Sequence, residues 1–264
     1  MRHAFTNHWP EYCMEAAELA IFMLAACVAA VVLFDPASAV APASPLVQRL
    51  LMGLAMGGTA VAIIYSPLGK QSGAHFNPAV TLTYLRLGKI EPWDAGFYIL
   101  FQFLGGVAGV LLAAALLGPS IEAPQVNYIV TVPGPWGVTV ALLAEFAISF
   151  VLMSTVLFSS NSKRLAGWTP WLVGGLLVMF VLFEAPLSGM SMNPARTVAS
   201  AWPADVWTAW WIYFASPALA MLTAAELYIR VRGFHKVHCA KLHHDARWRC
   251  IFRCGYRADA ATSL

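Results

Sequence analysis

The chain contains one short motif twice, and this repeat restricts its fold more than any other feature of the sequence. The copies read SGAHFNPAVT from residue 72 and SGMSMNPART from residue 188, and six of their ten positions are identical. Each copy contains an Asn-Pro-Ala triplet, listed in order as Asn77, Pro78, Ala79 and Asn193, Pro194, Ala195. An Asn side chain can cap the first turn of a helix, and Pro suits the first helical position. Each triplet therefore predicts the start of a helix.

The two helices that begin at these triplets are expected to be short. Gly88 follows the first and Pro203 interrupts the second, which limits them to about residues 78–88 and 194–202. About ten residues at 1.5 Å per residue cover roughly half of a hydrocarbon core about 30 Å thick. Two such half-helices, one from each copy, can meet near the membrane midplane with their N-termini facing each other.

Composition places the chain in a membrane. Hydrophobic residues make up 59% of the 264 residues and charged residues only 11%, against about 25% charged residues in soluble domains. Six apolar runs are long enough to span a bilayer, and they lie at about residues 16–34, 46–65, 93–117, 138–158, 168–182 and 206–229. The N-terminal sequence does not follow a signal-peptide pattern, so we expect the first run to be retained as a span. The sequence thus predicts an all-α membrane protein with six transmembrane helices and two re-entrant half-helices.

Lys and Arg are distributed unevenly between the two sides that six spans define. Fourteen of the sixteen fall on the side that holds both termini, and only Arg49 and Arg196 fall on the other. Because cytoplasmic loops carry the excess of basic residues, this bias predicts a multi-pass protein of the cell membrane with both termini in the cytoplasm. The formal charge of +3 is then a topology signal and does not indicate a nucleic-acid partner. The five Cys residues do not predict a disulfide framework.

The two halves of the chain correspond element by element. Each has a span containing a Glu, a second span, a motif with its half-helix, and a third span. Three spans per half turn the second half over in the membrane, which is an inverted-topology repeat. We predict a channel domain at residues 14–230, with repeats at about 14–118 and 138–230. Residues 1–13 are expected to form a cytoplasmic N-terminal tail, and residues 231–264 a basic cytoplasmic C-terminal tail.

The residues around the triplets favour a path for small neutral molecules. Non-helical backbone at membrane depth needs hydrogen-bond partners or a water-filled lumen, and Asn77 and Asn193 would supply paired amide donors there. A water that accepts from both must turn its hydrogens away from them, which interrupts a proton wire. The positive ends of the two half-helices oppose cations. Arg196 takes the place of Val80 in the repeat alignment and offers five donors to a passing solute.

Polar residues within the spans predict a buried scaffold. Glu18 and Glu145 lie in corresponding spans, and carboxylates at membrane depth are functional or paired. We expect both to accept N–H groups from the extended loops that precede the triplets, and we do not expect a proton relay. Gln102 and His75 are expected to belong to the same scaffold.

The C-terminal tail is rich in His and Cys between His235 and Tyr256. These residue types suit Zn²⁺, but the segment contains no C-x-x-C pair. We therefore expect a basic tail that lies against anionic lipid headgroups. Neither a metal site nor a cofactor is predicted.

With these motifs the chain resembles the aquaporin, or major intrinsic protein, family. The resemblance covers about residues 14–230 and rests mainly on the twin motif. It implies a right-handed six-span bundle with two half-helices, and a homotetramer with one pore in each subunit. It also implies that Asn77 and Asn193 are donors to the pore and that Arg196 belongs to the outer selectivity filter.

The resemblance places the other filter positions at Val181, at Met190, and at either Met56 or Gly57. Water channels of this family carry His at the position of Val181 and glycerol facilitators carry Gly, so this filter follows neither group. The loop before Asn77 is one residue longer than is usual in the family, which leaves both second-span residues open.

We expect a passive channel for water, also open to small neutral solutes, that excludes protons and ions. Thr197 and Tyr213 resemble the water-channel side of the family. One alternative is a facilitator for glycerol, metalloids or other small neutral solutes, favoured by the absence of His at position 181. More remote alternatives are a metal-responsive membrane protein that uses the tail, and an intramembrane enzyme. The spans show no nucleophile–base set at depth, so we expect no catalysis.

Overall fold

The computed structural model describes residues 1–256, and the regular structure of this part of the chain is helical. Within it, six helices are long and apolar enough to cross a membrane. They are α1 (Arg2–Phe34), α2 (Pro45–Tyr65), α5 (Pro92–Leu117), α6 (Gly137–Ser160), α7 (Thr169–Phe183) and α10 (Ile212–Arg232). The six predicted spans are therefore confirmed, with changed boundaries for the first and the last.

The remaining helices are short. The α-helical ones are α3 (Pro67–Ser72), α4 (Pro78–Arg86), α8 (Ala185–Ser188) and α9 (Pro194–Ala204). In the described residues, four short 3₁₀ helices lie in the connections, at η1 (Gly118–Glu122), η2 (Asn127–Ile129), η3 (Ala166–Trp168) and η4 (Phe234–Lys236). The chain order of the first half, two spans, a short helix, a half-helix and a third span, recurs in the second half.

The two predicted half-helices are confirmed as α4 and α9. The Asn77 side chain caps α4 by accepting the N–H of Ala79, and Pro78 occupies the first turn. Asn193 caps α9 in the same way, accepting the N–H groups of Ala195 and Arg196. Both helices thus begin at their Asn-Pro-Ala triplets, as the capping preference of Asn and the fixed φ of Pro require.

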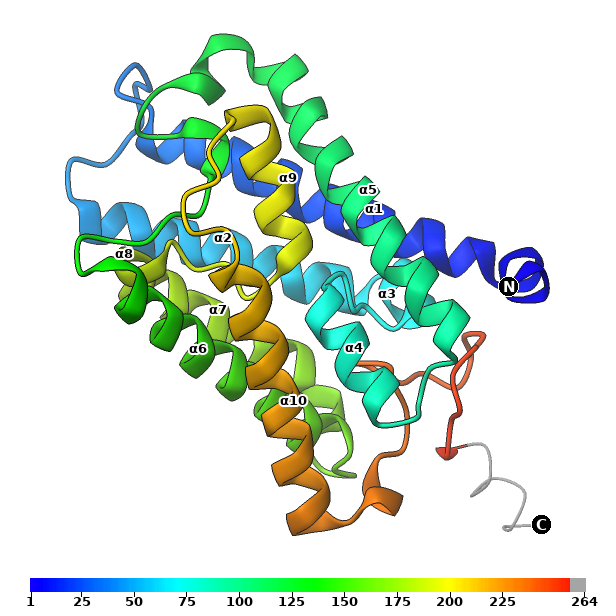
Figure 1. Cartoon of the computed structure of the whole chain (residues 1–264). Coiled ribbons are helices and arrows are strands. Elements are labelled where there is room, and N and C mark those ends of the chain that lie inside the picture. Colours follow the sequence, from blue (N-terminus) through cyan, green and yellow to red (C-terminus); the bar gives the residue numbers. More distant parts are fainter. Residues whose placement is uncertain (257–264) are drawn as a thin grey trace.

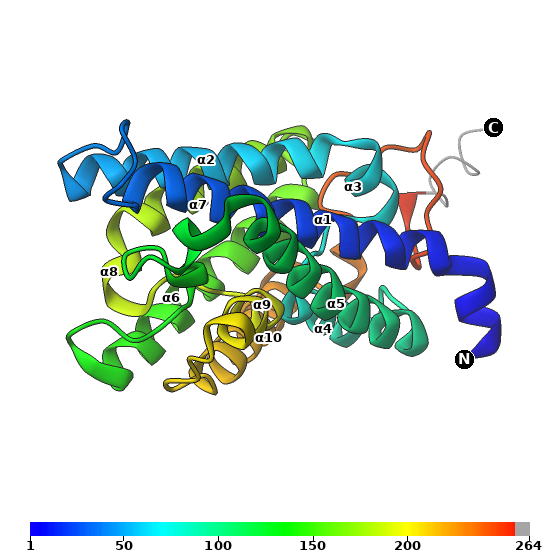
Figure 2. The same cartoon turned by 90° about the horizontal axis from the view of Figure 1, so that it is seen from above.

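The half-helices enter the bundle from opposite ends (Figure 1). The N-terminus and the last described residues lie at one end, which we call the termini end, and Figure 2 shows the same arrangement from above. The half-helix α4 lies toward the termini end and α9 toward the far end. Each packs against a span of the other repeat, α4 on α10 and α9 on α5. The two repeats therefore pack into each other, and they do not form two separate halves.

Glycines allow the closest helix contacts in the bundle. A Cβ atom on Gly57 of α2 would lie 2.5 Å from the carbonyl oxygen of Gly174 on α7. A Cβ atom on Gly105 of α5 would overlap the backbone of Ala16 on α1. Small residues let membrane helices approach until their backbones touch. The pairs α2–α7 and α1–α5 are fixed in this way around the centre of the molecule.

The first helix begins well before the predicted span. Residues expected as an N-terminal tail form the first turns of α1, which continues through Pro10. Tyr12 anchors this extension, because its ring stacks on Phe97 at 5.0 Å between centroids and its hydroxyl donates to Asp94 at 2.6 Å. Long-range packing on α5 therefore makes a polar segment helical.

The last span begins later than predicted, at Ile212 instead of residue 206. Asp205 and Ala209 have φ angles of 51° and 48°, in the left-handed region. Such residues interrupt a right-handed helix, so the Trp-containing segment between α9 and α10 forms turns. Hydropathy alone does not show this break.

Candidate functional site

A cavity of about 390 Å³ lies between the two repeats. Its lining includes Arg49 and Arg196 near the far end, Asn77 and Asn193 in the middle, and Leu242 of the C-terminal segment at the termini end. Most of the other lining side chains are apolar: Phe22, Met52, Met56, Val80, Leu152, Val156, Val173, Leu177, Val181, Met190 and Met192. The polar groups in the lining are few, so each has a large influence on what can pass.

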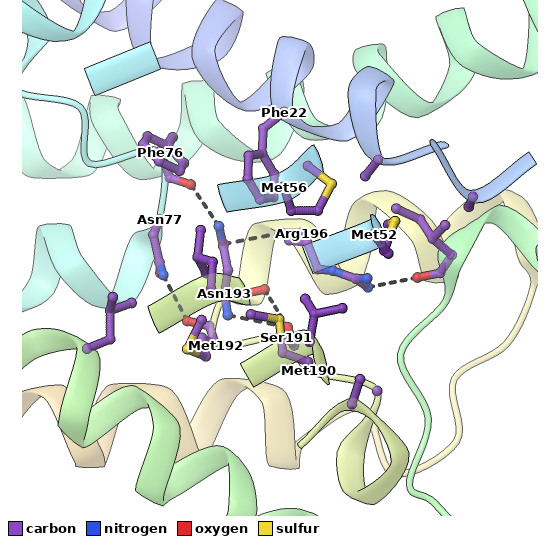
Figure 3. A pocket seen from close by; sticks show the side chains of 18 of the residues that line it. Phe22, Met52, Met56, Phe76, Asn77, Met190, Ser191, Met192, Asn193 and Arg196 are labelled. Atoms are coloured by element: carbon purple, nitrogen blue, oxygen red, sulfur yellow. Dashed lines mark hydrogen bonds between the residues drawn. The ribbon is translucent and has the colours of Figure 1, made fainter. Parts of the chain in front are cut away.

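The two triplet asparagines are cross-linked by hydrogen bonds (Figure 3). The amide of Asn77 donates to the carbonyl of Met192 at 2.8 Å, and the amide of Asn193 donates to the carbonyl of Phe76 at 2.7 Å. Each asparagine thus caps its own half-helix with its oxygen and holds the loop of the other repeat with its nitrogen. The N-termini of α4 and α9 are held together at the cavity.

Each amide nitrogen carries two N–H donors, and the crossed bonds use one from each asparagine. The second donor of each is free to serve the cavity, which both side chains line. The positive ends of two helix dipoles meet at the same place. The centre of the cavity therefore offers donors to an oxygen atom and repels a cation.

Buried carboxylates hold the two extended loops. Glu145 on α6 accepts the N–H groups of Ser191 at 2.6 Å and Met192 at 2.7 Å. In the first repeat Glu15 on α1 has the same role, since it accepts the N–H groups of His75 at 2.9 Å and Phe76 at 2.7 Å. These paired bonds fix the carbonyls that the asparagines use.

The expected role of Glu18 is therefore wrong. Its carboxylate accepts from the hydroxyl of Ser72 at 2.5 Å, and Glu15 is the counterpart of Glu145. The pairing of Glu18 with Glu145 rested only on their corresponding places in the first span of each repeat. Glu15 lies one helical turn earlier on the same face of α1. Because both carboxylates lie on this face, either of them could have been the acceptor for the loop N–H groups.

Gln102 and His75 lie where the scaffold prediction puts them. Gln102 donates to Glu15 at 2.6 Å and to the hydroxyl of Thr81 at 3.1 Å. His75 contacts the Thr81 hydroxyl through Nδ1 at 3.1 Å, and its Nε2–H donates to the carbonyl of Ala240 at 2.8 Å. The second contact joins the first loop to the C-terminal segment, which the sequence did not predict.

Arg196 extends from the first turn of α9 into the cavity, and its guanidinium donates to the carbonyl of Ile129 at 2.8 Å (Figure 3). One N–H is thus fixed by the backbone of the loop between α5 and α6. The remaining donors of its planar fork are available to a solute. Arg196 is the charged group closest in sequence to the crossed asparagines.

The other predicted filter positions divide into lining and packing residues. Met56, Val181 and Met190 line the cavity. Gly57, the alternative to Met56, faces Gly174 on α7, and the backbone of α7 occupies the space where a side chain would lie. Gly57 is therefore a packing residue. Met52, one turn before Met56 on the same helix, also lines the cavity (Figure 3), and sequence reasoning did not single it out.

Comparison with known proteins agrees with this arrangement. Residues 4–228 match the profile of the family described as Major intrinsic protein. The chain is 36% identical over 188 residues to Aquaporin NIP2-2 of Zea mays, covering 70% of this chain and 61% of that relative. It is 35% identical over 187 residues to Aquaporin NIP6-1 of Arabidopsis thaliana, covering 70% of this chain and 59% of that relative. The chain thus spans about three fifths of the length of these relatives.

A solved structure has the same fold. The aquaglyceroporin from Plasmodium falciparum superposes with a TM-score of 0.72 at 20% sequence identity, over 85% of this chain and 96% of that one. At this identity the likeness concerns the fold, six spans with two half-helices.

Proposed function

This chain belongs to the major intrinsic protein family, and on that premise we propose that it is a passive membrane channel for small neutral solutes, water included. The observation that carries the proposal is the pairing of Asn77 and Asn193 inside a largely apolar cavity whose far end carries Arg196. Channel selectivity follows from the width of a pore, the donors and acceptors that line it, and its electrostatic barriers.

Uncharged molecules with hydroxyl groups suit this lining best. Met56, Val181 and Met190 present thioether and methyl groups, against which the carbon skeleton of a small polyol can lie. Arg196 and the asparagine amides can donate to its oxygens. The relatives named as aquaporins support a channel function, and the apolar lining favours a channel that is not restricted to water.

Ions and protons should be excluded at two places. Arg196 presents a fixed positive charge toward the far end, and the two half-helix N-termini add positive potential in the middle. A water that accepts from both asparagines cannot pass a proton onward by donating toward them. The scaffold carboxylates do not form a relay in this proposal, because backbone N–H groups occupy Glu15 and Glu145. No catalytic role is proposed.

We also propose the setting of the channel. The excess of basic residues at the termini end supports a cytoplasmic position for that end, in a chain that spans the cell membrane. Residues 14–230 would form the channel and residues 231–264 the cytoplasmic tail. Exposed apolar side chains cover the spans, for example Leu104, Leu143 and Leu219, and such surfaces suit lipid or the neighbouring subunits of a homotetramer.

The test is a stopped-flow comparison in proteoliposomes. Vesicles containing the chain should shrink and reswell faster than empty vesicles in a glycerol gradient, and osmotic water flux should also rise. A pH-sensitive dye in the same vesicles should report no added proton flux. Water flux without glycerol flux would favour the water-selective alternative. A proton conductance comparable with the water flux would contradict the proposed mechanism.

A further inference from the structure

Four potential metal ligands meet in the segment that follows α10. They are Cys239, His244, Cys250 and Cys254, and their ligand atoms all lie within 4.8 Å of one another. Cys239 and Cys250 are buried, and the other two are partly buried. The spans contribute none of these side chains, so this is a separate site from the cavity.

The spacing of the ligand atoms is close to that of a tetrahedral site. Around Zn²⁺, with bonds of about 2.3 Å to sulfur and about 2.0–2.1 Å to nitrogen, neighbouring ligand atoms are about 3.4–3.8 Å apart. The sulfurs of Cys239 and Cys250 are 3.7 Å apart, and Nε2 of His244 is 3.1 Å from the sulfur of Cys254. Small adjustments of side chains would bring all four to one centre.

The ligand types select the metal. Three thiolates with one imidazole form a closed set of four soft or borderline ligands, which suits Zn²⁺ in a structural site. The sequence pattern is C-x₄-H-x₅-C-x₃-C, and its last pair falls within the C-x₂₋₄-C spacing typical of zinc ligands. The pattern contains no C-x-x-C pair.

A disulfide is the competing use of these cysteines. The sulfurs of Cys239 and Cys250 are too far apart for a bond of about 2.05 Å. In the proposed orientation the segment is cytoplasmic, where thiols stay reduced and such patterns serve metals.

We propose that Cys239, His244, Cys250 and Cys254 bind one Zn²⁺ ion, and that the ion locks residues 238–256 as a cap over the termini end of the cavity. The metal site stands independently of the channel assignment. The effect of the cap on transport rests on the proposed function.

The capping segment is fastened to three parts of the bundle. His238 donates its N–H to the side chain of Asn161 after α6, at 2.7 Å. Leu242 donates its N–H to the carbonyl of Gly73 in the first motif, at 3.0 Å, and Arg253 donates to the carbonyl of Lys89 after α4, also at 3.0 Å. In Figure 1 this orange-to-red segment crosses beside α3 and α4, and Figure 2 shows it beside α3 as well. The packing of this segment on the bundle was not predicted from the sequence, and residues 257–264 of the expected tail lie outside the described residues.

The cap reaches the cavity through Leu242. This side chain lines the cavity and is only 4% exposed. Beside it, the ring of Phe252 stacks on His75 at 5.5 Å between centroids. Phe252 of the tail thus covers His75, two residues before Asn77, while Leu242 lines the cavity. The four ligands lie on both sides of this contact in the sequence, so a bound ion would tie the two arms of the loop together.

The charge of the site also fits its surroundings. Zn²⁺ with three thiolates and a neutral imidazole carries a net charge of −1. Lys241, two residues after Cys239, is 1% exposed. Its ammonium donates to the carbonyls of Lys70 and Arg249, both at 2.6 Å, and Arg249 directly precedes Cys250. A buried cation next to an anionic metal centre is compensated, as buried charges must be.

The first experiment measures the metal in the purified full-length chain under reducing conditions. Elemental analysis should find about one zinc per chain, as for a structural site with four protein ligands. Replacement with Co²⁺ should give thiolate-to-metal absorption and the visible bands of tetrahedral cobalt. A chain that retains no zinc and shows no such absorption with cobalt would overturn the site.

Variants then separate the ligands from other cysteines. Cys254→Ser and Cys239→Ser should lose zinc retention, while Cys13→Ser, at an exposed position on α1, should keep it. The ligand substitutions lie outside the membrane helices, so the channel should still fold, and size-exclusion chromatography checks this. Equal zinc content in all three variants would contradict the assignment.

The cap is tested by protease sensitivity and by flux. Chelation should expose the buried Lys241 to trypsin and raise solute flux severalfold, and returned zinc should reverse both effects. Leu242→Ala should retain zinc, and its solute flux should already be raised. Chelation should then increase this flux only slightly further. Zinc that binds without changing either readout would overturn the cap. If no form conducts above empty vesicles, the proposed channel function fails while the metal result stands.

Discussion

The different roles of Glu15 and Glu18 allow a sharp test of how the loops are held. Glu15→Ala removes the acceptor for the N–H groups of His75 and Phe76 and for the amide of Gln102. Glu18→Ala removes the acceptor for one hydroxyl, that of Ser72. The two side chains lie on the same helix, are both fully buried and have the same chemistry, so each is a matched control for the other.

The expected difference in stability follows from the donors left without an acceptor. A buried donor that loses its acceptor costs about 1–3 kcal/mol. The two backbone N–H groups released by Glu15→Ala therefore cost on the order of 2–6 kcal/mol. A hydroxyl can rotate to another acceptor, so Glu18→Ala should cost only about 1 kcal/mol. For a chain of this size the first change corresponds to a fall in Tm of the order of 10 °C.

The assay is thermal unfolding of the purified variants in one detergent, with Glu145→Ala as the comparator from the second repeat. Glu15→Ala and Glu145→Ala should lower the apparent Tm by similar amounts, and Glu18→Ala should lower it much less. If Glu15→Ala does not yield folded protein, Glu15→Gln keeps the shape of the side chain and should still be less stable than Glu18→Gln. Glu18 variants as unstable as Glu15 variants would refute the assignment of Glu15 as the loop acceptor.

Three further predictions concern the cavity and the packing around it. Arg196→Val should still conduct water, pass larger neutral solutes faster and admit some proton leak. The reason is that the electrostatic barrier falls, since a unit charge acting on another over about 4 Å is worth about 4 kcal/mol at an effective dielectric of 20. Unchanged selectivity in stopped-flow assays would show that Arg196 is not part of the filter. Val181→His should lower the ratio of glycerol flux to water flux by narrowing the cavity with a polar ring, and an unchanged ratio would mean that position 181 does not line the constriction. Gly174→Ala should lower thermal stability by about 1–3 kcal/mol through overpacking, because its Cβ would lie 2.5 Å from Val61 and 2.9 Å from the backbone of Gly57. Gly175→Ala, whose Cβ would meet nothing within 4 Å, should be neutral, and equal effects of the two changes would contradict the α2–α7 packing.

The parts of the fold that the sequence predicted are those determined by local chemistry. Asn77 and Asn193 cap the helices that follow them because a cap needs only its own next few residues. The spans follow from apolar length. The pairing of the triplets follows from their repetition. Each of these signals is contained in a short stretch of chain.

The features that could not be predicted from the sequence depend on residues far apart in the chain. Glu15 reaches His75 across 60 positions, and the registers of the two repeats differ too much to transfer it from Glu145 by spacing. The extension of α1 depends on Asp94 and its neighbours on α5. Leu242 enters the cavity because its backbone bonds to Gly73 in the first motif. The spacing of Glu15 and Glu18 marks both carboxylates as candidates, but no local pattern shows which of them reaches the loop.

The crossed asparagine bonds have a consequence for how such a chain is made. The carbonyl that Asn77 needs belongs to Met192, 115 positions further along the chain. When the first repeat leaves the ribosome and enters the bilayer, that partner has not been synthesised. Until then the first half-helix and its loop can rely only on contacts within the first repeat, such as those with Glu15. A fragment that ends after the first repeat can satisfy this site only by pairing with a second fragment inserted in the opposite direction.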